Sequence, residues 1–416
     1  MTAALIAVPA LSLVIWLYLV LLHGRFWRCD QVLNQDAGPT SALSPEVVVV
    51  VPARNEAAVI GQSLKSLLCQ NYHGPFRVVL VDDHSDDGTR ATAERVADES
   101  GAARRLTITG ARPLPPGWSG KLWAVSEGVA KAAKLSPAAR YLLLTDADIH
   151  HDSGSISRLV AKAEAEKLDL VSLMVLLDHS GFWAGLLIPA FVFFFQKLYP
   201  FPWVNTPGHR MAAAAGGCIL VRRDALVKAG GIERIRGALI DDCTLGAVIK
   251  AGPGKLWLGL TTRLVSLRPY TRFGEIWDMV ARTAYTQLHY SPLLLLGALL
   301  GMVLTYLVAP LAVLTLPLHH SWPAAVLGLA TWGLLACAYQ PTLRLYGKPA
   351  AAALLLPMVG FMYSLMTVAS AVRHWRGRGG QWKGRTYQAA GKSASASGAG
   401  PEPGPESRPG PGRKAE

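Results

Sequence analysis

Cysteine is scarce in this chain, and its five copies follow no recognisable spacing. The thiols of Cys29, Cys69, Cys218, Cys243 and Cys337 are scattered, without the paired spacing of disulfides or the short spacing of metal ligands. This pattern argues against a zinc site and fits a reduced, cytosolic environment. Internal repeats are also lacking.

Charge is absent from residues 3–22, a stretch about as long as the ~20 residues that a bilayer-spanning helix needs. No basic residue precedes it, whereas Arg25 and Arg28 follow it, which favours an uncleaved anchor over a secretory signal peptide. We therefore expect an N-terminal transmembrane anchor at 1–24. By the positive-inside rule, the two arginines place the next domain in the cytoplasm.

Charge is sparse again after Pro292, which predicts a C-terminal transmembrane region at 291–373. Its candidate spans are 292–318, 322–343 and 349–372, with prolines that neighbouring helices can accommodate. Three full crossings would put Arg373 and Arg376 outside, against the positive-inside rule. One segment is therefore expected to be re-entrant or interfacial, and the stretch interrupted by Pro357 and Gly360 is the first candidate.

Acidic residues are fewer than basic ones, with 28 Asp and Glu against 41 Lys and Arg and a net charge of +13. Much of the excess lies beside the predicted spans and in the tail, so anionic lipid headgroups are a simpler partner than nucleic acid. We expect a basic juxtamembrane segment at 374–388 and a disordered tail at 389–416, where Ala, Gly, Ser and Pro dominate.

Residues 41–290 alternate apolar runs with longer amphipathic stretches, which predicts an α/β domain. Glu46–Val51, Phe76–Val81 and Tyr141–Leu144 are apolar almost throughout, as parallel strands buried on both faces are. Polar residues follow each run, and open α/β sheets bind ligands at that edge. Residues 181–204 are aromatic-rich but lie between motifs that must share one compartment, so we expect an interfacial helix there.

Two polar turns follow the first two runs. The polar turn at 52–56 (PARNE) could bind a nucleotide. An ordinary β–α loop, with Asn and Glu at the start of a helix, would have the same sequence pattern. Asp82 and Asp83 open a cluster of four acids, whose mutual repulsion calls for a cation or hydrogen-bond donors. We expect these two to bind a ligand, whereas Ser85, Asp86 or Asp87 could cap the helix after Thr89.

Two further acidic pairs could bind a metal ion or accept a proton. Asp146 and Asp148 lie one residue apart directly after the third run, and Asp-x-Asp, although weak alone, can hold Mg²⁺ or Mn²⁺ against a diphosphate. Asp241 and Asp242 begin a helical stretch, where a carboxylate could act as a general base or simply favour the helix dipole. The stretches at 118–121 (WSGK) and 381–387 (QWKGRTY) each place a cation beside a Trp, as a phosphate clamp or a membrane anchor would.

Taken in order, VPARNE, VDDHSDDGT, WSGK, TDAD, GGCILVRRDAL, IDDCTLG and WKGRTY resemble the family 2 glycosyltransferases. The layout of one anchor, an interfacial stretch and C-terminal spans looks most like the hopene-associated glycosyltransferases of bacterial hopanoid clusters. The resemblance implies a GT-A nucleotide-sugar-binding domain, with a mixed, mostly parallel sheet and helices on both faces.

The resemblance also implies roles for individual residues. The nucleotide pocket would be lined by Pro52, Ala53, Arg54 and Glu56, with Asp82 or Asp83 on the base or ribose and Lys121 on the sugar diphosphate. Asp146 and Asp148 would serve the nucleotide-sugar, with Asp148 the more direct metal ligand. Asp242 would be the base of a single inverting displacement, with Asp241 beside it where the family usually has Glu.

One departure narrows the expected activity. Processive polysaccharide synthases carry Gln-x-x-Arg-Trp after the base, whereas His289 and Tyr290 stand at the comparable positions here. Arg282, Lys383 or Arg385 could supply the missing charge. We therefore expect transfer of a single sugar from a nucleoside diphosphate sugar, such as a UDP-sugar, to a membrane lipid, with no obligatory protein partner. A processive synthase and an inactive scaffold are the alternatives.

Overall fold

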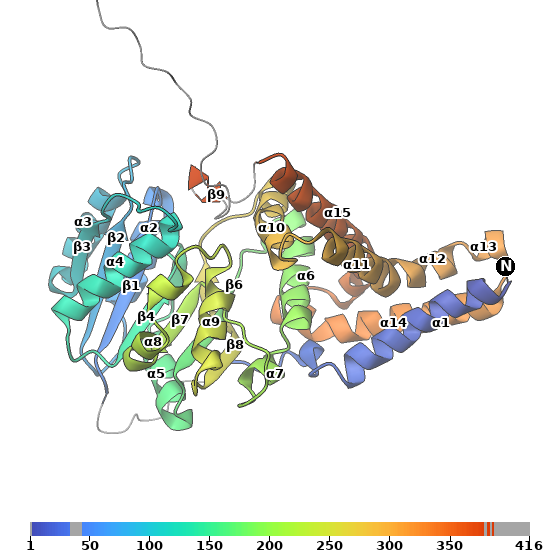
Figure 1. Ribbon diagram of the computed structural model, residues 1–416, viewed down its shortest axis with the longest axis horizontal. Coiled ribbons are helices and arrows are strands. Elements are labelled where there is room, and N and C mark those ends of the chain that lie inside the picture. The colour runs from blue at the N-terminus through green and yellow to red at the C-terminus, as the bar shows by residue number, and fades with distance from the viewer. Residues whose placement is uncertain (1, 34–43, 378–380, 383–384, 387–416) are drawn as a thin grey trace, which may run out of the picture.

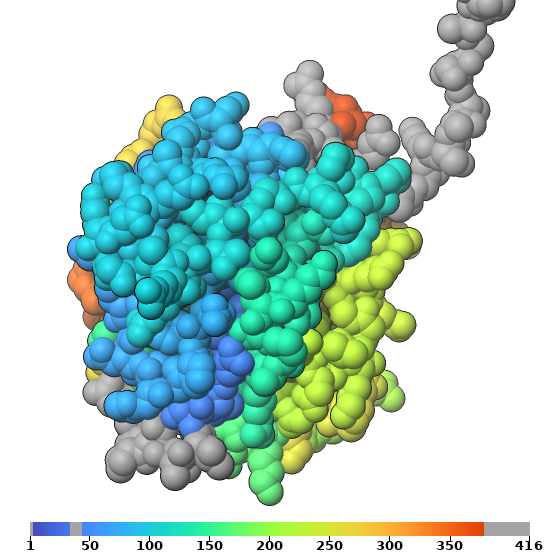
Figure 2. Space-filling view, turned by 90° about the vertical axis from the view of Figure 1, so that its left-hand side faces the viewer, coloured from blue at the N-terminus to red at the C-terminus, as the bar shows by residue number. Residues whose placement is uncertain are grey.

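The computed structural model describes residues 2–33, 44–377, 381–382 and 385–386. An α/β domain forms one end of the molecule, and a bundle of apolar helices forms the other (Figure 1). Figure 2 views the domain from the end away from the bundle, where residues of its first half lie against residues coloured yellow-green. The two halves of the domain therefore form one continuous body.

An eight-stranded sheet forms the centre of the domain, in the order β3-β2-β1-β4-β7-β6-β8-β5. The β1–β2, β1–β4, β2–β3 and β6–β8 pairs are parallel, and the β4–β7, β6–β7 and β5–β8 pairs are antiparallel. The strands are β1 (Val47–Ala53), β2 (Phe76–Asp82), β3 (Leu106–Gly110), β4 (Tyr141–Thr145), β5 (Ile149–His151), β6 (Leu170–Leu176), β7 (Cys218–Arg222) and β8 (Leu256–Ser266). The mixed, mostly parallel sheet expected from the sequence is confirmed.

Strand β1 explains why an uninterrupted apolar run forms the middle of this sheet. Every residue of β1 is buried, because helices cover both faces of the sheet. Its pairing with β4 ends at Val50, so Pro52, which has no N–H, removes no hydrogen bond from that ladder. The strand can therefore carry a proline next to its last residue, Ala53.

Helices pack on both faces of the sheet. One face carries α2 (Ala57–Leu68), α3 (Thr89–Glu99) and α5 (Ser155–Glu166), and the other carries α4 (Gly120–Leu135), α8 (Arg223–Lys228) and α9 (Asp241–Ala251). Helix α4 comes very close to β1, because a Cβ added at Gly128 would lie 2.3 Å from Val50 Cγ1. Gly128 thus lets α4 lie directly on the centre of the sheet.

Within the described residues, four apolar stretches are long enough to cross a membrane: Ala3–Leu21, Pro292–Leu314, Trp322–Leu345 and Ala350–Trp375. They are formed by α1 (Thr2–Leu21), α11 (Pro292–Met302), α12 (Val308–Leu314), α14 (Trp322–Leu345) and α15 (Leu356–Trp375), with the π-helix η4 (Val303–Leu307) and the 3₁₀-helix η5 (Ala350–Leu355). The short helix α13 (Leu316–His319) lies between the second and third stretches. Apolar helices at both ends of the chain, as expected, are confirmed.

The N-terminal helix joins the C-terminal ones through two hydrogen bonds. Ser12 Oγ donates to the carbonyl of Leu304 at 2.6 Å, and the indole N–H of Trp16 donates to the carbonyl of Thr305 at 2.6 Å. Both carbonyls lie in the π-helix η4, just before Pro310, where the regular hydrogen-bond ladder is broken. Helix α1 therefore satisfies backbone groups that a plain α-helix would have paired.

The aromatic stretch forms α6 (Phe182–Leu198) and α7 (Phe201–Asn205), between the α/β domain and the apolar helices (Figure 1). Helix α6 packs against α14 and α15: the rings of Phe193 and Tyr339 lie 5.0 Å apart, and Tyr363 Oη donates to the carbonyl of Leu187. It is shorter than the four candidate spans. Its interfacial placement stays a prediction.

Candidate functional site

The turn between β4 and β5 carries Asp146 and Asp148 at the carboxyl edge of the central strands. Thr145, the last residue of β4, is buried, and its hydroxyl donates to the carbonyl of Gly217 at 2.8 Å. The same hydroxyl hydrogen-bonds the ring of buried His151 at 2.9 Å. Because β7 runs antiparallel to β4, its first residues lie at this edge too. Both strands therefore fix the position of the acidic turn.

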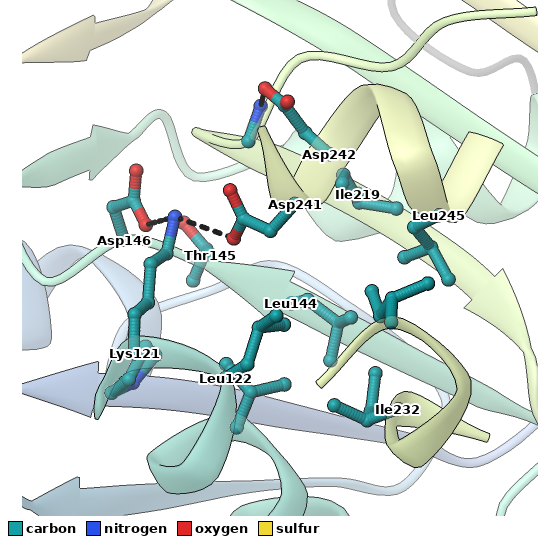
Figure 3. Close-up of a pocket in the computed structure, with 14 residues that line it drawn as sticks. Lys121, Leu122, Leu144, Thr145, Asp146, Ile219, Ile232, Asp241, Asp242 and Leu245 are labelled. Atoms are coloured by element: carbon teal, nitrogen blue, oxygen red, sulfur yellow. Dashed lines mark hydrogen bonds and ion pairs between the residues drawn. The ribbon is translucent and has the colours of Figure 1, made fainter. Parts of the chain in front are cut away.

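Lys121 joins the two acidic pairs. Its Nζ lies 2.9 Å from Asp146 Oδ1 and 3.2 Å from Asp241 Oδ2 (Figure 3). It is the second residue of α4, whose start is capped by Ser119, the acceptor for the N–H of Leu122. Burial opposes the charged form of Lys121, but the attraction of the carboxylates outweighs it and raises the pKa of this amine. Lys121 therefore stays a cation between the pairs.

Asp242 is held by backbone donors rather than by a cation. Its Oδ2 accepts the N–H of Gly216 at 2.8 Å, and its Oδ1 accepts the N–H of Cys243 at 2.7 Å. Burial and repulsion from Asp241 raise the pKa of Asp242 to about 6, although Lys121 and the two N–H groups oppose that rise. A positioned carboxylate with this pKa can accept a proton near neutral pH.

Asp148 occupies an acidic environment. Burial, together with repulsion from Asp146 and Glu56, raises its pKa to about 6, and Arg268 offsets part of this effect. In the described part of the chain, no three His, Cys, Asp or Glu side chains are grouped to hold a metal ion by themselves. Mg²⁺ is commonly held by one or two carboxylates together with substrate phosphates, and Asp146 and Asp148 fit that arrangement.

An open cleft with a volume of about 200 Å³ lies over these residues. Both charge signs line it: Glu56, Asp146, Asp148 and Asp241 are acidic, and Lys121, Arg268 and Arg282 are basic. A smaller, mostly apolar pocket adjoins it and shares Lys121, Asp146 and Asp241 with it (Figure 3). The cleft thus suits a ligand that carries phosphates and a bound cation.

The expected nucleotide-pocket residues divide into two groups. Pro52 and Glu56 line the cleft. The side chain of Ala53 is instead packed in the core of the sheet. Arg54 turns toward Asp83: its Nη1 donates to the carbonyl of Asp83 at 2.6 Å and lies 3.7 Å from the carboxylate. This ion pair between the partly buried Arg54 and the buried Asp83 supplies the kind of compensation that the sequence predicted, namely a cation or hydrogen-bond donors.

The carboxylates of Asp82 and Asp87, in the acidic motif after β2, accept hydrogen bonds from backbone N–H groups. Asp82 Oδ1 accepts the N–H of Ser85 at 3.1 Å. Asp87 accepts the N–H of Thr89 at 3.0 Å and that of Ala57 at 2.9 Å, which are the first residues of α3 and α2. Asp87 therefore satisfies one backbone group at the start of each helix, although the N-cap positions belong to Gly88 and Glu56. Asp82 and Asp83 are absent from the residues that line the two clefts described above.

Arg282, Lys383 and Arg385 were the residues expected to supply positive charge, and the structure describes two of them. Arg282, on α10 (Phe273–Gln287), lines the main cleft, and its charge role stays a prediction. Lys383 and the tail 389–416 lie outside the described residues. Arg385 belongs to the short strand β10 (Arg385–Thr386), which pairs antiparallel with β9 (Gln381–Trp382). Its proposed charge role stays a prediction.

Three residues beside the site escaped the sequence analysis. Arg268 follows β8, whose end could have been recognised as another strand end. Tyr199, just after α6, accepts a 2.6 Å hydrogen bond from Gln287 at the end of α10, and burial raises its pKa. Cys243 and Asp242 add to that rise, which places this pair near Asp242. No local pattern marks either residue.

Residues 48–230 match the model of the family described as Glycosyl transferase family 2. The chain is similar to a solved structure of mannosyltransferase PcManGT from Pyrobaculum calidifontis in complex with GDP-Man and Mn²⁺, at 19% identity and a TM-score of 0.51, covering 89% of this chain and 99% of that one. This likeness supports a GT-A-like fold.

Two weaker likenesses are to Mycobacterium tuberculosis glucosyl-3-phosphoglycerate synthase and to S. aureus TarS 1-349 in complex with UDP-GlcNAc. The first has 18% identity and a TM-score of 0.40, covering 62% of this chain and 87% of that one. The second has 12% identity and a TM-score of 0.37, covering 80% and 92%. No curated protein sequence matches the chain.

Proposed function

We propose that this chain, whose residues 48–230 match the Glycosyl transferase family 2 model, is an inverting, metal-dependent glycosyltransferase. It moves one sugar from a nucleoside diphosphate sugar, such as a UDP-sugar, to a membrane lipid of hopanoid type. The domain lies on the cytoplasmic face of a bacterial inner membrane. The observation that carries this proposal is the cluster in which Lys121 draws two acidic pairs together under one cleft.

The donor side of the cleft is built for a diphosphate. Asp148 and Asp146 would hold Mg²⁺ or Mn²⁺, which would neutralise the charge that develops on the diphosphate as the sugar bond breaks. Lys121, Arg268 and Arg282 add positive charge along the same cleft. Glu56 and Pro52 form its wall beside β1, where the nucleoside would lie.

The acceptor side is built for removal of a proton. Asp242 takes the proton of the acceptor hydroxyl through its carboxylate while the hydroxyl oxygen forms a bond to the anomeric carbon. The bond from that carbon to the diphosphate oxygen breaks in the same step, which inverts the configuration. The N–H groups of Gly216 and Cys243 hold the carboxylate in place throughout.

An amphiphilic acceptor explains why a transferase domain is joined to apolar helices at both ends of its chain. Helix α10 contributes Arg282 and Thr283 to the cleft and packs against α6 and α15. The cleft therefore lies beside the apolar helices, where the polar end of a membrane lipid would be presented. The main alternative, a processive synthase, would give long products.

The test incubates membranes containing the protein with labelled nucleoside diphosphate sugars and lipid extract, with Mg²⁺, Mn²⁺ or EDTA. We expect a labelled lipid that carries one sugar and disappears with EDTA. Asp98→Asn, an exposed acid on α3, is the matched control and should retain full activity. A labelled polymer would favour the synthase, and no metal-dependent lipid product with any donor would overturn the proposal.

A further inference from the structure

The last apolar stretch, Ala350–Trp375, begins and ends on the same side of the bundle. Just before it, Lys348 Nζ donates to the carbonyl of His179 at 2.8 Å, in the loop after β6. Near its end, Arg373 Nη2 donates to Asp278 Oδ1 at 2.6 Å, on the helix α10 that lines the cleft. Both ends are therefore tied to the neighbourhood of the α/β domain.

The middle of this stretch reaches only the middle of the neighbouring spans. The indole N–H of Trp332, halfway along α14, donates to the carbonyl of Leu354 at 3.3 Å. Gly360 lies against Tyr306, in the middle of Pro292–Leu314, where an added Cβ would come within 2.9 Å of Tyr306 Cγ. Helix α15 does not extend to the far end of the bundle, where the N-terminus and α13 lie (Figure 1).

We infer that residues 349–375 form a re-entrant hairpin that enters and leaves the membrane on the side of the α/β domain. The 3₁₀-helix η5 leads inward, and α15 leads back out. Irregular backbone is tolerated at membrane depth where protein covers it, and here Ala353 is fully buried while Trp332 satisfies the carbonyl of Leu354. Three segments then cross the membrane: Ala3–Leu21, Pro292–Leu314 and Trp322–Leu345.

This arrangement removes the conflict in the distribution of positive charge. With three crossings and a hairpin, Arg344, Lys348, Arg373 and Arg376 all lie on the same side as Arg25 and Arg28. Basic residues next to short spans favour one side of the membrane, so the hairpin satisfies the rule that a fourth crossing would break.

The outer face of the hairpin fits acyl chains. Leu354, Met358, Phe361 and Leu365 are all exposed, at a helical spacing that places them along one face. The opposite positions, such as Leu356, Val359 and Met366, are buried against the bundle. Exposed leucines of α11, among them Leu293 and Leu300, extend the apolar surface of the bundle. The occupant to which we commit is the hydrocarbon of the bilayer.

The hairpin also supports one wall of the cleft. The N–H of Tyr285 on α10 donates to Ser370 Oγ on α15 at 3.0 Å, beside the Arg373–Asp278 ion pair. The same helix α10 presents Arg282 and Thr283 to the cleft. A lipid-anchored segment thus holds the cleft at the membrane surface. This inference rests on the membrane placement in the proposed function and is independent of the transfer reaction.

The test maps single cysteines with a membrane-impermeant maleimide in right-side-out and inverted vesicles of the full-length protein. Native Cys69 is exposed and reports the side of the α/β domain. Leu318→Cys, at the exposed far end, and Arg376→Cys, after α15, are made separately in a Cys69→Ser chain. We expect Arg376→Cys to react in the same vesicles as Cys69, and Leu318→Cys to react in the opposite ones.

Labelling of Arg376→Cys together with Leu318→Cys would show a full crossing and overturn the hairpin. Labelling of Leu318→Cys together with Cys69 would remove the membrane placement itself, and the hairpin with it. The expected labelling pattern in a protein that transfers no sugar would leave the hairpin standing and overturn only the reaction.

A second measurement tests the outer face. In a chain whose native cysteines are replaced by Ser, a spin label at Phe361→Cys should collide more often with oxygen, which concentrates in hydrocarbon, than with a water-soluble nickel chelate. Arg376→Cys, beyond the hairpin, is the control and should show the reverse preference. A label at residue 361 that favours the nickel chelate would place the outer face in water and overturn the inference.

Discussion

The two acidic pairs of the cleft are alike in one respect and different in another. Each gives one carboxylate to Lys121, namely Asp146 and Asp241, and keeps the other apart from that ion pair. The second members, Asp148 and Asp242, both have a pKa raised to about 6. Their surroundings differ, because acids flank Asp148 whereas backbone N–H groups hold Asp242. The surrounding acids favour a metal ion at Asp148, whereas burial and Asp241 favour a proton on Asp242, whose carboxylate the N–H groups hold in position.

Asp242→Asn should have the largest effect, because it removes the proton acceptor and keeps the size of the side chain. We expect the transfer rate to fall by about 10³-fold, within the range for a lost general base. Donor affinity should change little, because Asp242 lies on the other side of Lys121 from the Asp146 turn. Single-turnover transfer and calorimetric donor binding measure the two quantities. Retained turnover would remove Asp242 from its role.

Asp148→Asn should weaken donor binding, in contrast with Asp242→Asn, which should slow the transfer step. The loss of a hard anionic oxygen should weaken metal-supported donor binding by about 10-fold to 100-fold, as the loss of a ligand charge does. In contrast with Asp242→Asn, the deficit should appear in the concentration of Mn²⁺ needed for half-maximal binding. Asp98→Asn again serves as the control. An unchanged Mn²⁺ requirement would assign the metal elsewhere.

The pH dependence of the transfer rate should report the pKa of Asp242. The pKa of Asp242 is raised to about 6 by burial and by Asp241, so the active, deprotonated form is lost as the pH falls through 6. At saturating metal and donor, the rate should therefore fall about tenfold for each pH unit below 6 and stay level above it, as for one essential base. A rate that remains level down to pH 5 would contradict the raised pKa.

Lys121→Met tests whether the two acidic pairs depend on their shared cation, because it leaves both pairs without it. Repulsion between Asp146 and Asp241 should separate the two pairs and lower the transfer rate by about 10-fold, in the range of 1–2 kcal/mol that a partly exposed network contributes. Lys121→Arg keeps the charge and should recover part of the rate. Equal rates for the Met and Arg variants would show that charge at this position does not matter.

The sequence predicted the strand ends well, because they depend on local patterns. The runs at 46–51, 76–81 and 141–144 became β1, β2 and β4 with ends within two residues, since β-branched apolar runs followed by polar turns suit buried parallel strands. The same rule places Asp146 and Asp148 at the end of β4, and their roles stay predictions. The burial of the Ala53 side chain in the core could not be predicted, because no alternation is visible in an all-apolar run.

Contacts between segments that lie far apart in the chain could not be predicted from the sequence. Nothing in the spacing shows that Lys121 reaches Asp241, or that the N–H of Gly216 meets Asp242, because these contacts depend on β7 running antiparallel to β4. The compensation of Asp83 by Arg54 was likewise hidden between two turns that looked independent. Topology, rather than local propensity, brings these groups together.

Thr145→Val should have the smallest effect and tests whether the two pairs are linked through the backbone. The Thr145 hydroxyl donates to the carbonyl of Gly217, next to the residue whose N–H holds Asp242, and Thr145 itself precedes Asp146. Valine keeps the shape but removes the hydrogen bonds to the carbonyl of Gly217 and to the buried ring of His151, at a cost of about 1–3 kcal/mol in the free energy of unfolding. If the link positions both pairs, the transfer rate and the metal affinity should fall together by a few-fold. The same loss of stability with only one of the two affected would show that the pairs are held independently.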